Sequence, residues 1–212
     1  MLIIYSNCEK KAIIKPVNKI VLIGAGGHSR SCIEIIEENN DLKIEAIVDT
    51  FTKDKIFEGY KVINNENELK DIYKNIDNAF ICIGFTYKKN LIIRENIYKN
   101  LKKICFKIPI IQSKHSYVSK KTKIGDGTII MHNSFVNSNV SIGNNVILNT
   151  GSIIEHDSNI GDNCHISTGV IINGTCNVGK NSFIGSGSVL PNNYNVKPNS
   201  FKKALKLITD LT

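Results

Sequence analysis

An aliphatic residue returns at every sixth position of this chain from Val118 to Ile208, with one exception at Lys202. A period of six fits neither a helix face at 3.6 residues nor a plain strand at 2.0, so it indicates a repeat architecture. The aliphatic positions are Val118, Ile124, Ile130, Val136, Ile142, Leu148, Ile154, Ile160, Ile166, Ile172, Val178, Ile184, Leu190, Val196 and Ile208.

A small or β-branched residue stands two positions before most of these aliphatic residues. This second register consists of Thr122, Thr128, Ser134, Val140, Val146, Ser152, Ser158, Cys164, Val170, Cys176, Ser182 and Ser188. Residues two apart on a short strand point to the same side, so we expect both registers to face one interior. Glycine recurs every eighteen residues, at Gly125, Gly143, Gly161 and Gly179. Three repeats should therefore make one coil of a triangular prism, with a glycine at one corner for its unusual backbone angles.

The first half of the chain has a different pattern, in which apolar strands alternate with helices. Strands are expected at 19–24, 44–49 and 79–84, and helical spacing follows at 24–39, 67–75 and 88–101. An apolar, strand-like run, KICFKIPII, closes the series. This alternation predicts a parallel sheet in an α/β, Rossmann-like domain. We place that domain at 19–111, after an N-terminal extension (1–18) that is either an edge strand or disordered, and the all-β domain at 112–212.

Composition excludes several classes of function. The formal net charge of +8 comes from scattered lysines without interleaved aromatic residues, which argues against a nucleic-acid partner. The six cysteines show neither CxxC pairing nor metal-ligand spacing, and we expect all of them to be buried, reduced thiols of a cytoplasmic protein. The N-terminus lacks the features of a signal peptide, and no apolar run is long enough for a membrane span.

A glycine-rich turn, Gly24-Ala25-Gly26-Gly27-His28, joins the first strand to the first helix. Small residues here let a phosphate or sugar approach backbone N–H groups at the helix N-terminus. The fingerprint is incomplete, because Ser29 replaces its third glycine, and the alternative is a tight turn that binds nothing. Asp49 ends the second strand, where an acidic residue commonly binds a ribose or sugar hydroxyl. A redox dinucleotide is disfavoured, because the domain is only about half of a full dinucleotide fold.

The combination of GAGGH, Asp49, an ICIG strand and coils containing NTGSIIEHDSNIGDNCHISTG resembles the sialic-acid O-acetyltransferase-like family of hexapeptide-repeat acyltransferases, which includes bacterial UDP-amino-sugar N-acetyltransferases. The resemblance implies a Rossmann-like sugar-nucleotide-binding domain and a left-handed parallel β-helix. It also implies a homotrimer that binds acetyl-CoA between subunits and transfers acetyl to a nucleotide-activated amino sugar without a metal.

The same resemblance assigns roles to individual residues. His156 matches the catalytic base, flanked by the carboxylates of Glu155 and Asp157. His165, Gly174 and Gly185 match acetyl-CoA-binding positions, with Asn149 as a further candidate, and Gly26, Gly27, His28 and Asp49 match the sugar-nucleotide pocket. The chain departs from the family at its end, where lysines replace repeat residues and the AGxPA tail is absent. We interpret this end as a degenerate capping coil.

Both histidines lie outside the inward-facing registers, so we expect them to face out of the β-helix. His156 would take a proton as a sugar amine attacks the thioester, with Asp157 or Glu155 fixing its tautomer. Backbone N–H groups or His165 would stabilise the oxyanion. Homotrimer contacts are expected from small outward side chains at Asn137, Thr150 and Ser167.

Three other functions stay open from the sequence. The first is O-acetylation of a sialic-acid-like sugar, because the same base could deprotonate a hydroxyl group. The second is a zinc site of the γ-carbonic-anhydrase type formed by His132, His156 and His165. The third is a non-catalytic scaffold that binds a sugar nucleotide.

Overall fold

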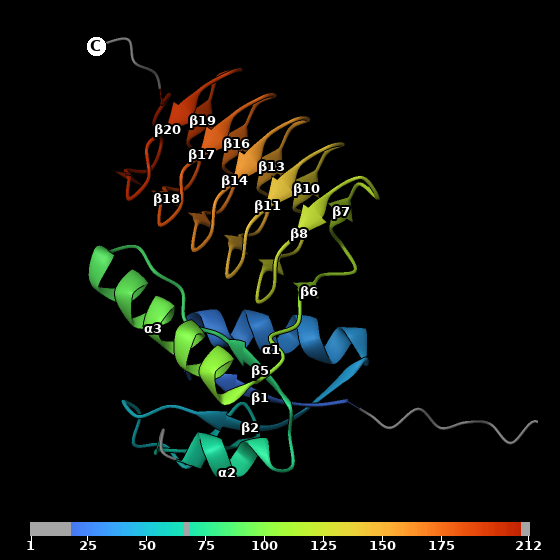
Figure 1. Cartoon of the computed structure of the whole chain (residues 1–212), viewed down its shortest axis with the longest axis vertical. Coiled ribbons are helices and arrows are strands. Elements are labelled where there is room, and N and C mark those ends of the chain that lie inside the picture. The colour runs from blue at the N-terminus through green and yellow to red at the C-terminus, as the bar shows by residue number, and fades with distance from the viewer. Residues whose placement is uncertain (1–17, 66–67, 209–212) are drawn as a thin grey trace, which may run out of the picture.

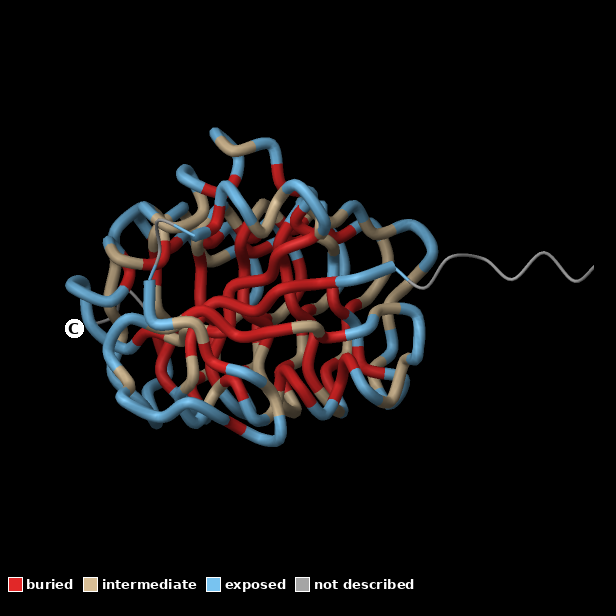
Figure 2. The backbone as a smooth tube through the Cα atoms, turned by 90° about the horizontal axis from the view of Figure 1, so that it is seen from below, coloured by how far each residue is buried: buried red, intermediate tan, exposed pale blue. Residues whose placement is uncertain are grey.

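The computed structural model describes residues 18–65 and 68–208, and it consists of an α/β domain followed by a β-helix (Figure 1). The predicted N-terminal extension lies outside the described residues, except for Asn18, which begins β1. No helix in the described ranges is long and apolar enough to cross a membrane. Figure 2 shows the buried backbone as continuous runs through the interior of the molecule.

Within its described residues, the α/β domain has one five-stranded sheet and three helices. Its elements are β1 (Asn18–Ile23), α1 (Gly27–Asn39), β2 (Leu42–Val48), β3 (Ile56–Phe57), β4 (Tyr60–Ile63), α2 (Leu69–Tyr73), β5 (Asn78–Ile81) and α3 (Lys88–Ile104). The strand order is β3-β4-β2-β1-β5, and β1 is parallel to both of its neighbours, β2 and β5. The winding therefore reverses at β1, and ligands of such sheets bind in the crevice at the carboxyl ends of these strands.

Two features of this domain differ from the prediction. The hairpin of β3 and β4 was not expected, and it turns at Glu58 and Gly59 with φ values of 47° and 81°, as a two-residue hairpin turn requires. The strand-like run at 103–111 is instead the end of α3 and a loop, apart from a parallel bridge between Lys107 and Asn78 and from Ile111, which begins β6 (Ile111–Gln112) of the β-helix. Cys105 caps α3 in the left-handed conformation and is exposed, so its predicted burial was wrong.

Three parallel sheets form the faces of the β-helix. Face A consists of β6 (Ile111–Gln112), β9 (Ile129–Ile130), β12 (Ile147–Leu148), β15 (His165–Ile166), β18 (Phe183–Ile184) and β21 (Phe201–Lys202). Face B consists of β7 (Tyr117–Val118), β10 (Phe135–Val136), β13 (Ile153–Ile154), β16 (Ile171–Ile172) and β19 (Val189–Leu190). Face C consists of β8 (Lys123–Ile124), β11 (Ser141–Ile142), β14 (Asn159–Ile160), β17 (Asn177–Val178) and β20 (Asn195–Val196).

The two registers do face one interior. From Ile130 to Val196 every aliphatic residue of the series is buried, and the small register is buried from Thr128 onward. Paired residues of neighbouring coils differ by eighteen, as with Phe135 and Ile153. The interior is filled by aliphatic side chains that alternate with small ones, so the repeat period is a packing requirement.

The corner glycines are required for a different reason from the one expected. Gly143 and Gly161 do not have positive φ, but a Cβ on either would lie 2.6 Å from a backbone nitrogen of the next coil. The left-handed corner positions are instead occupied largely by asparagine, which tolerates that conformation better than most residues. The asparagines at these corners, with φ between 54° and 62°, are Asn133, Asn139, Asn145, Asn163, Asn181, Asn193 and Asn199.

The outer side of face A packs against the α/β domain. Ile129 and Ile147, the outward residues of β9 and β12, are fully buried and belong to the same core as the sheet strands β1 and β5. Helix α1 lies between the sheet and the β-helix (Figure 1). The two domains thus share a hydrophobic interface, and no other described segment of the chain covers faces B and C.

Candidate functional site

His156 lies at the corner between faces B and C, and its side chain is 58% exposed. Its Nδ1 is 2.8 Å from Oδ2 of Asp157. The left-handed conformation of Asp157, with φ of 61°, turns the carboxylate back toward the preceding residue. Asn139 donates to the other carboxylate oxygen at 2.7 Å. These hydrogen bonds, that from Asn139 first and that from His156 second, lower the pKa of Asp157.

The sequence left two candidates, Glu155 and Asp157, for the carboxylate that orients His156, and the geometry favours Asp157. Asp157 contacts the imidazole, whereas Glu155 accepts a hydrogen bond from Asn137 in the preceding coil. With Nδ1–H donated to Asp157, Nε2 of His156 carries the free lone pair. That is the tautomer a general base needs.

Gly174 lies one coil beyond His156, directly against its ring. A Cβ at Gly174 would be 2.7 Å from Cε1 of His156 and 2.8 Å from Nε2. The missing side chain of Gly174 therefore makes room for the imidazole. Gly185 lies at the other end of face B, where a Cβ would be 2.4 Å from the backbone nitrogen of Ala204.

His165 faces out of the β-helix as expected, but it is buried under the α/β domain with only 5% exposure. Its Nδ1 is 2.6 Å from the carbonyl oxygen of Phe85, and Nε2 is 3.4 Å from Nδ2 of Asn149. The rings of Phe85 and Phe183 pack edge-on against it. Burial lowers the pKa of His165 to about 3, so the ring is neutral at physiological pH.

The neutral tautomer of His165 donates from Nδ1 to Phe85 and accepts from Asn149 at Nε2. In this arrangement His165 presents no N–H to a developing oxyanion. Sequence alone missed this, because the covering residue, Phe85, comes from a distant loop. His165, Asn149 and Gly185 gather near the corner between faces A and B, while His156 and Gly174 lie at the corner between faces B and C.

The glycine turn of the α/β domain is fixed by side chains that the fingerprint does not include. Oγ of Ser29 donates to the carbonyl oxygen of Gly24 at 2.7 Å and accepts from the N–H of Gly26 at 3.1 Å. Oδ2 of Asp49 accepts from the N–H of Ala25 at 2.7 Å, and Oδ1 accepts from two further backbone N–H groups. Asp49 thus holds the turn in place and keeps only limited capacity for a ligand.

Gly26 and Gly27 leave open space, since a Cβ on either would meet nothing within 4 Å. With His28 and Asp49 they line a cavity of ≈ 540 Å³ at the carboxyl edge of the sheet. The structure therefore brings together all four residues expected at the sugar-nucleotide pocket. Lys89, at the start of α3, lines the same cavity and supplies a positive charge that the sequence did not single out.

A second cavity of ≈ 430 Å³ adjoins the first, shares several of its lining residues and adds aliphatic side chains of β2, α2 and α3. Asn96 and Asn100, four residues apart on α3, supply amide groups to this cavity. The two cavities together provide a charged part beside the glycine turn and an apolar part with a few hydrogen-bonding groups. A nucleotide has the same division between phosphates and base.

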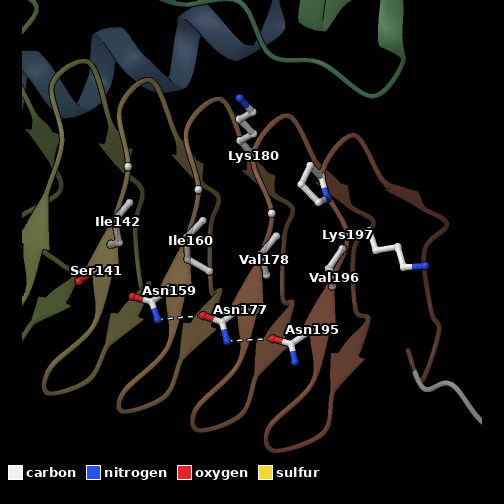
Figure 3. A pocket seen from close by; sticks show the side chains of 14 residues that line it. Ser141, Ile142, Asn159, Ile160, Asn177, Val178, Lys180, Asn195, Val196 and Lys197 are labelled. Carbon is white, nitrogen blue, oxygen red and sulfur yellow. Dashed lines mark hydrogen bonds between the residues drawn. The ribbon is translucent and has the colours of Figure 1, made fainter.

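Face C carries a shallow groove of ≈ 640 Å³ (Figure 3). A ladder of amide hydrogen bonds of 2.9 Å and 2.8 Å connects Asn159, Asn177 and Asn195 along it. Lys180 and Lys197 border the groove, but His156 does not line it. We therefore do not place the chemistry in this groove.

The three histidines of the zinc hypothesis do not converge within one chain. His132 lies at the corner between faces A and B, His156 at the corner between faces B and C, and His165 is buried on face A. His132 hydrogen-bonds Ser113 instead. Their positions do not support a γ-carbonic-anhydrase-type site in a single chain.

Comparison with known proteins identifies the class. Residues 19–101 match the family described as PglD N-terminal domain, and residues 112–208 match the GMPPB C-terminal domain. A search of curated protein sequences gives no significant match. Over both domains the chain is similar to hexapeptide-repeat acetyltransferases with a left-handed β-helix, which confirms the resemblance and the fold class drawn from the sequence.

Several solved structures share the whole architecture. The acetyltransferase domain of PglB from Neisseria gonorrhoeae, in complex with acetyl coenzyme A, is 26% identical with a TM-score of 0.84, covering 92% of each chain. Perosamine N-acetyltransferase from Caulobacter crescentus, in complex with CoA and GDP-perosamine, is 23% identical with a TM-score of 0.84, covering 92% of this chain and 91% of that one. WeeI from Acinetobacter baumannii is 20% identical with a TM-score of 0.70, covering 91% of this chain and 97% of that one.

Proposed function

We propose that this chain is an acetyl-CoA-dependent acetyltransferase that N-acetylates a nucleotide-activated amino sugar in bacterial surface-glycan or glycoprotein biosynthesis. The observation that carries the proposal is the pairing of His156 with Asp157 at 2.8 Å on an exposed corner of the β-helix. The similarity to the acetyltransferase domain of PglB, which was solved with acetyl coenzyme A, supports the choice of donor.

The proposed reaction is direct acyl transfer. The amine nitrogen attacks the thioester carbonyl carbon, and Nε2 of His156 takes the proton that the nitrogen loses. The tetrahedral intermediate collapses as the C–S bond breaks, and the CoA thiolate leaves to be protonated. Asp157 stabilises the imidazolium that forms and fixes the ring orientation. The products are the N-acetyl sugar nucleotide and CoA.

Acetyl-CoA binding is assigned to Asn149, His165, Gly174 and Gly185. His165 is too enclosed to act as a base, so we give it a positioning role, in which it orients the amide of Asn149. Gly174 is assigned two roles. Its missing side chain makes room for the imidazole of His156, and the same space borders the proposed position of the thioester. The capping coil departs from the family pattern, so the end of the acetyl-CoA groove differs in this chain.

The sugar nucleotide is assigned to the cavity beside the glycine turn. Its diphosphate would lie against the N-terminus of α1, near Gly26, Gly27 and His28, where helix N–H groups and Lys89 favour an anion. The base would occupy the adjoining apolar cavity with Asn96. Asp49 supports this site chiefly through the backbone of the turn.

A homotrimer completes the site in this proposal. The outward residues of face B form an apolar stripe that no described residue of the same chain covers, which favours association. They are Tyr117, Phe135, Ile153, Ile171 and Val189. Asn137, Thr150 and Ser167 lie at the corners that border this face, beside the sites of His156 and His165. Packing face B against a neighbouring subunit would bring the two corners from different chains together.

Light scattering tests this assembly. The wild-type protein should have three times the mass of the chain, and Ile171→Glu should lower the mass and the activity together, whereas Ser141→Glu on face C should change neither. A monomeric wild-type protein that is fully active would contradict the trimer.

Acceptor specificity tests the function. Acetyl-CoA consumption should be measured with UDP-, GDP-, dTDP- and CMP-linked sugars in amino and hydroxyl forms. The proposal, which places the protein in the cytoplasm where both substrates are made, requires that a nucleotide-linked amino sugar be the best acceptor. A preference for a hydroxyl acceptor would support O-acetylation by the same base, and a preference for a free sugar would contradict the nucleotide site.

A further inference from the structure

Three groups with metal-binding atoms converge where the α/β domain meets the β-helix. Glu34 and Glu38 lie four residues apart and share one side of α1, and His132 comes from the corner between faces A and B. Their ligand atoms all lie within 4.8 Å of one another. Nε2 of His132 is 4.0 Å from Oε2 of Glu34, which is beyond hydrogen-bond reach.

The carboxylate of Glu38 provides a second, independent observation. Its Oε2 is buried and has no hydrogen-bond partner among the described residues. A buried carboxylate oxygen without a partner is costly, so natural structures normally pair it with a donor, a water molecule or a cation. A carboxylate oxygen of Glu38 lies within 4.8 Å of ligand atoms of a second carboxylate and an imidazole, which favours a cation.

The imidazole of His132 is held by its other nitrogen. Nδ1 is 2.6 Å from Oγ of Ser113, and that oxygen also accepts from the N–H of His115 at 3.0 Å. When Nδ1–H donates to Ser113, Nε2 turns its lone pair toward the two carboxylates. Metal-binding histidines are commonly oriented by such a hydrogen bond from the second ring nitrogen.

The charges around the cluster are compatible with a divalent cation. Two carboxylates face one imidazole, and the nearby ammonium of Lys114 is bound to the main-chain oxygen of Glu38. One imidazole with two carboxylates suits zinc, which accepts mixed nitrogen and oxygen ligands. Magnesium prefers oxygen ligands throughout and is the weaker candidate.

We propose that Glu34, Glu38 and His132 bind a divalent transition-metal ion, with Zn²⁺ as the best match, and that the ion ties α1 to the β-helix. This role goes beyond the proposed acetyl transfer and does not depend on it. Its ligands come from α1 and from the β-helix, so the ion would connect the two domains and have a structural role.

The test uses tag-free, full-length protein, stripped of metal by a chelator and titrated with Zn²⁺ in a calorimeter. We expect one Zn²⁺ per chain. His132→Asn and Glu38→Gln should each weaken the affinity by at least about tenfold. The matched controls His115→Asn and Glu37→Gln remove a neighbouring histidine and a neighbouring glutamate outside the cluster, and both should bind as the wild type does.

Thermal unfolding gives a readout separate from activity. Zn²⁺ at about a hundred times its Kd should raise the wild-type ratio of folded to unfolded protein about 100-fold, and His132→Asn should lose this effect. Magnesium at the same concentration should have a much smaller effect. Wild-type protein that binds no Zn²⁺, or that binds it as tightly after His132→Asn and Glu38→Gln, would overturn the proposal, whatever the outcome for acetyl transfer.

Discussion

Gly174→Ala is expected to disable the base without unfolding the protein. An alanine Cβ at Gly174 would lie 2.7 Å from Cε1 of His156 and 2.8 Å from Nε2. Non-bonded carbon atoms settle at about 3.5–4.0 Å, so the ring must move by roughly 0.8 Å or more. The backbone at Gly174 does not have positive φ and accepts alanine, and the exposed ring can swing toward solvent. The loss of unfolding free energy should therefore stay within about 0.5 kcal/mol.

Catalysis should respond far more strongly. Displacing a reacting group by about 1 Å can cost about 10²-fold in rate, so we expect kcat of Gly174→Ala to fall by about that factor. KM for acetyl-CoA should change by less than about twofold if the loss is confined to the transition state.

A double-mutant cycle separates the possible causes. If Gly174→Ala acts through the ring, the double variant Gly174→Ala/His156→Ala should be no slower than His156→Ala alone. An unchanged kcat of Gly174→Ala would contradict a displaced base. So would a double variant whose loss of kcat equals the product of the two single losses. A raised KM for acetyl-CoA with unchanged kcat would instead show that Gly174 acts only in the acetyl-CoA groove and not through the ring of His156.

Three further predictions concern the neighbouring groups. Asp157→Asn should lower kcat by about 10–10²-fold with the fold intact, because His156 loses the carboxylate that fixes its tautomer. Glu155→Gln should keep a kcat near that of the wild type. Steady-state kinetics of the two variants shows which carboxylate orients the base. Lys89→Gln should raise KM for the sugar nucleotide about tenfold with kcat unchanged, and this effect should shrink at high salt. Lys88→Gln should have little effect on KM. Equal effects of the two substitutions would contradict a direct contact between Lys89 and the sugar nucleotide. His165 has its pKa lowered from 6.5 to about 3 in the folded protein, so its contribution to stability is complete above pH 6.5 and is lost as the pH falls toward 3. Between pH 7 and pH 5 this amounts to about 2 kcal/mol, which chemical denaturation of wild type should show and that of His165→Gln should lack.

The β-helix could be predicted from the sequence because its constraint is local and repeats. Each inward position, such as Ile154 or Ser152, is set by packing against the same position eighteen residues away. The corner position of His156 follows from the same register. The reason for the corner glycines could not be read from the period, because the close approach at Gly143 involves the backbone of another coil.

The errors occur where distant segments meet. The repeat register correctly predicted that the side chain of His165 points out of the β-helix. It could not show that Phe85, from another part of the chain, covers this side chain. Cys105 has apolar neighbours in sequence, yet it caps a helix in the left-handed conformation. Ser29 appeared to be a defect in the glycine fingerprint, although its hydroxyl bridges Gly24 and Gly26. Lys89 lacked a motif and became visible only when α3 was placed beside the glycine turn.

His156 is proposed as the general base. This role is tested most directly by the kcat of His156→Ala with acetyl-CoA and the best nucleotide-linked amino sugar. We predict a loss of about 10²–10⁴-fold, with KM for acetyl-CoA nearly unchanged and without the acidic limb of the wild-type pH profile. A correctly folded and assembled His156→Ala protein that keeps near-full activity at about pH 7.5, where a neutral histidine would act as the base, would contradict the proposed mechanism.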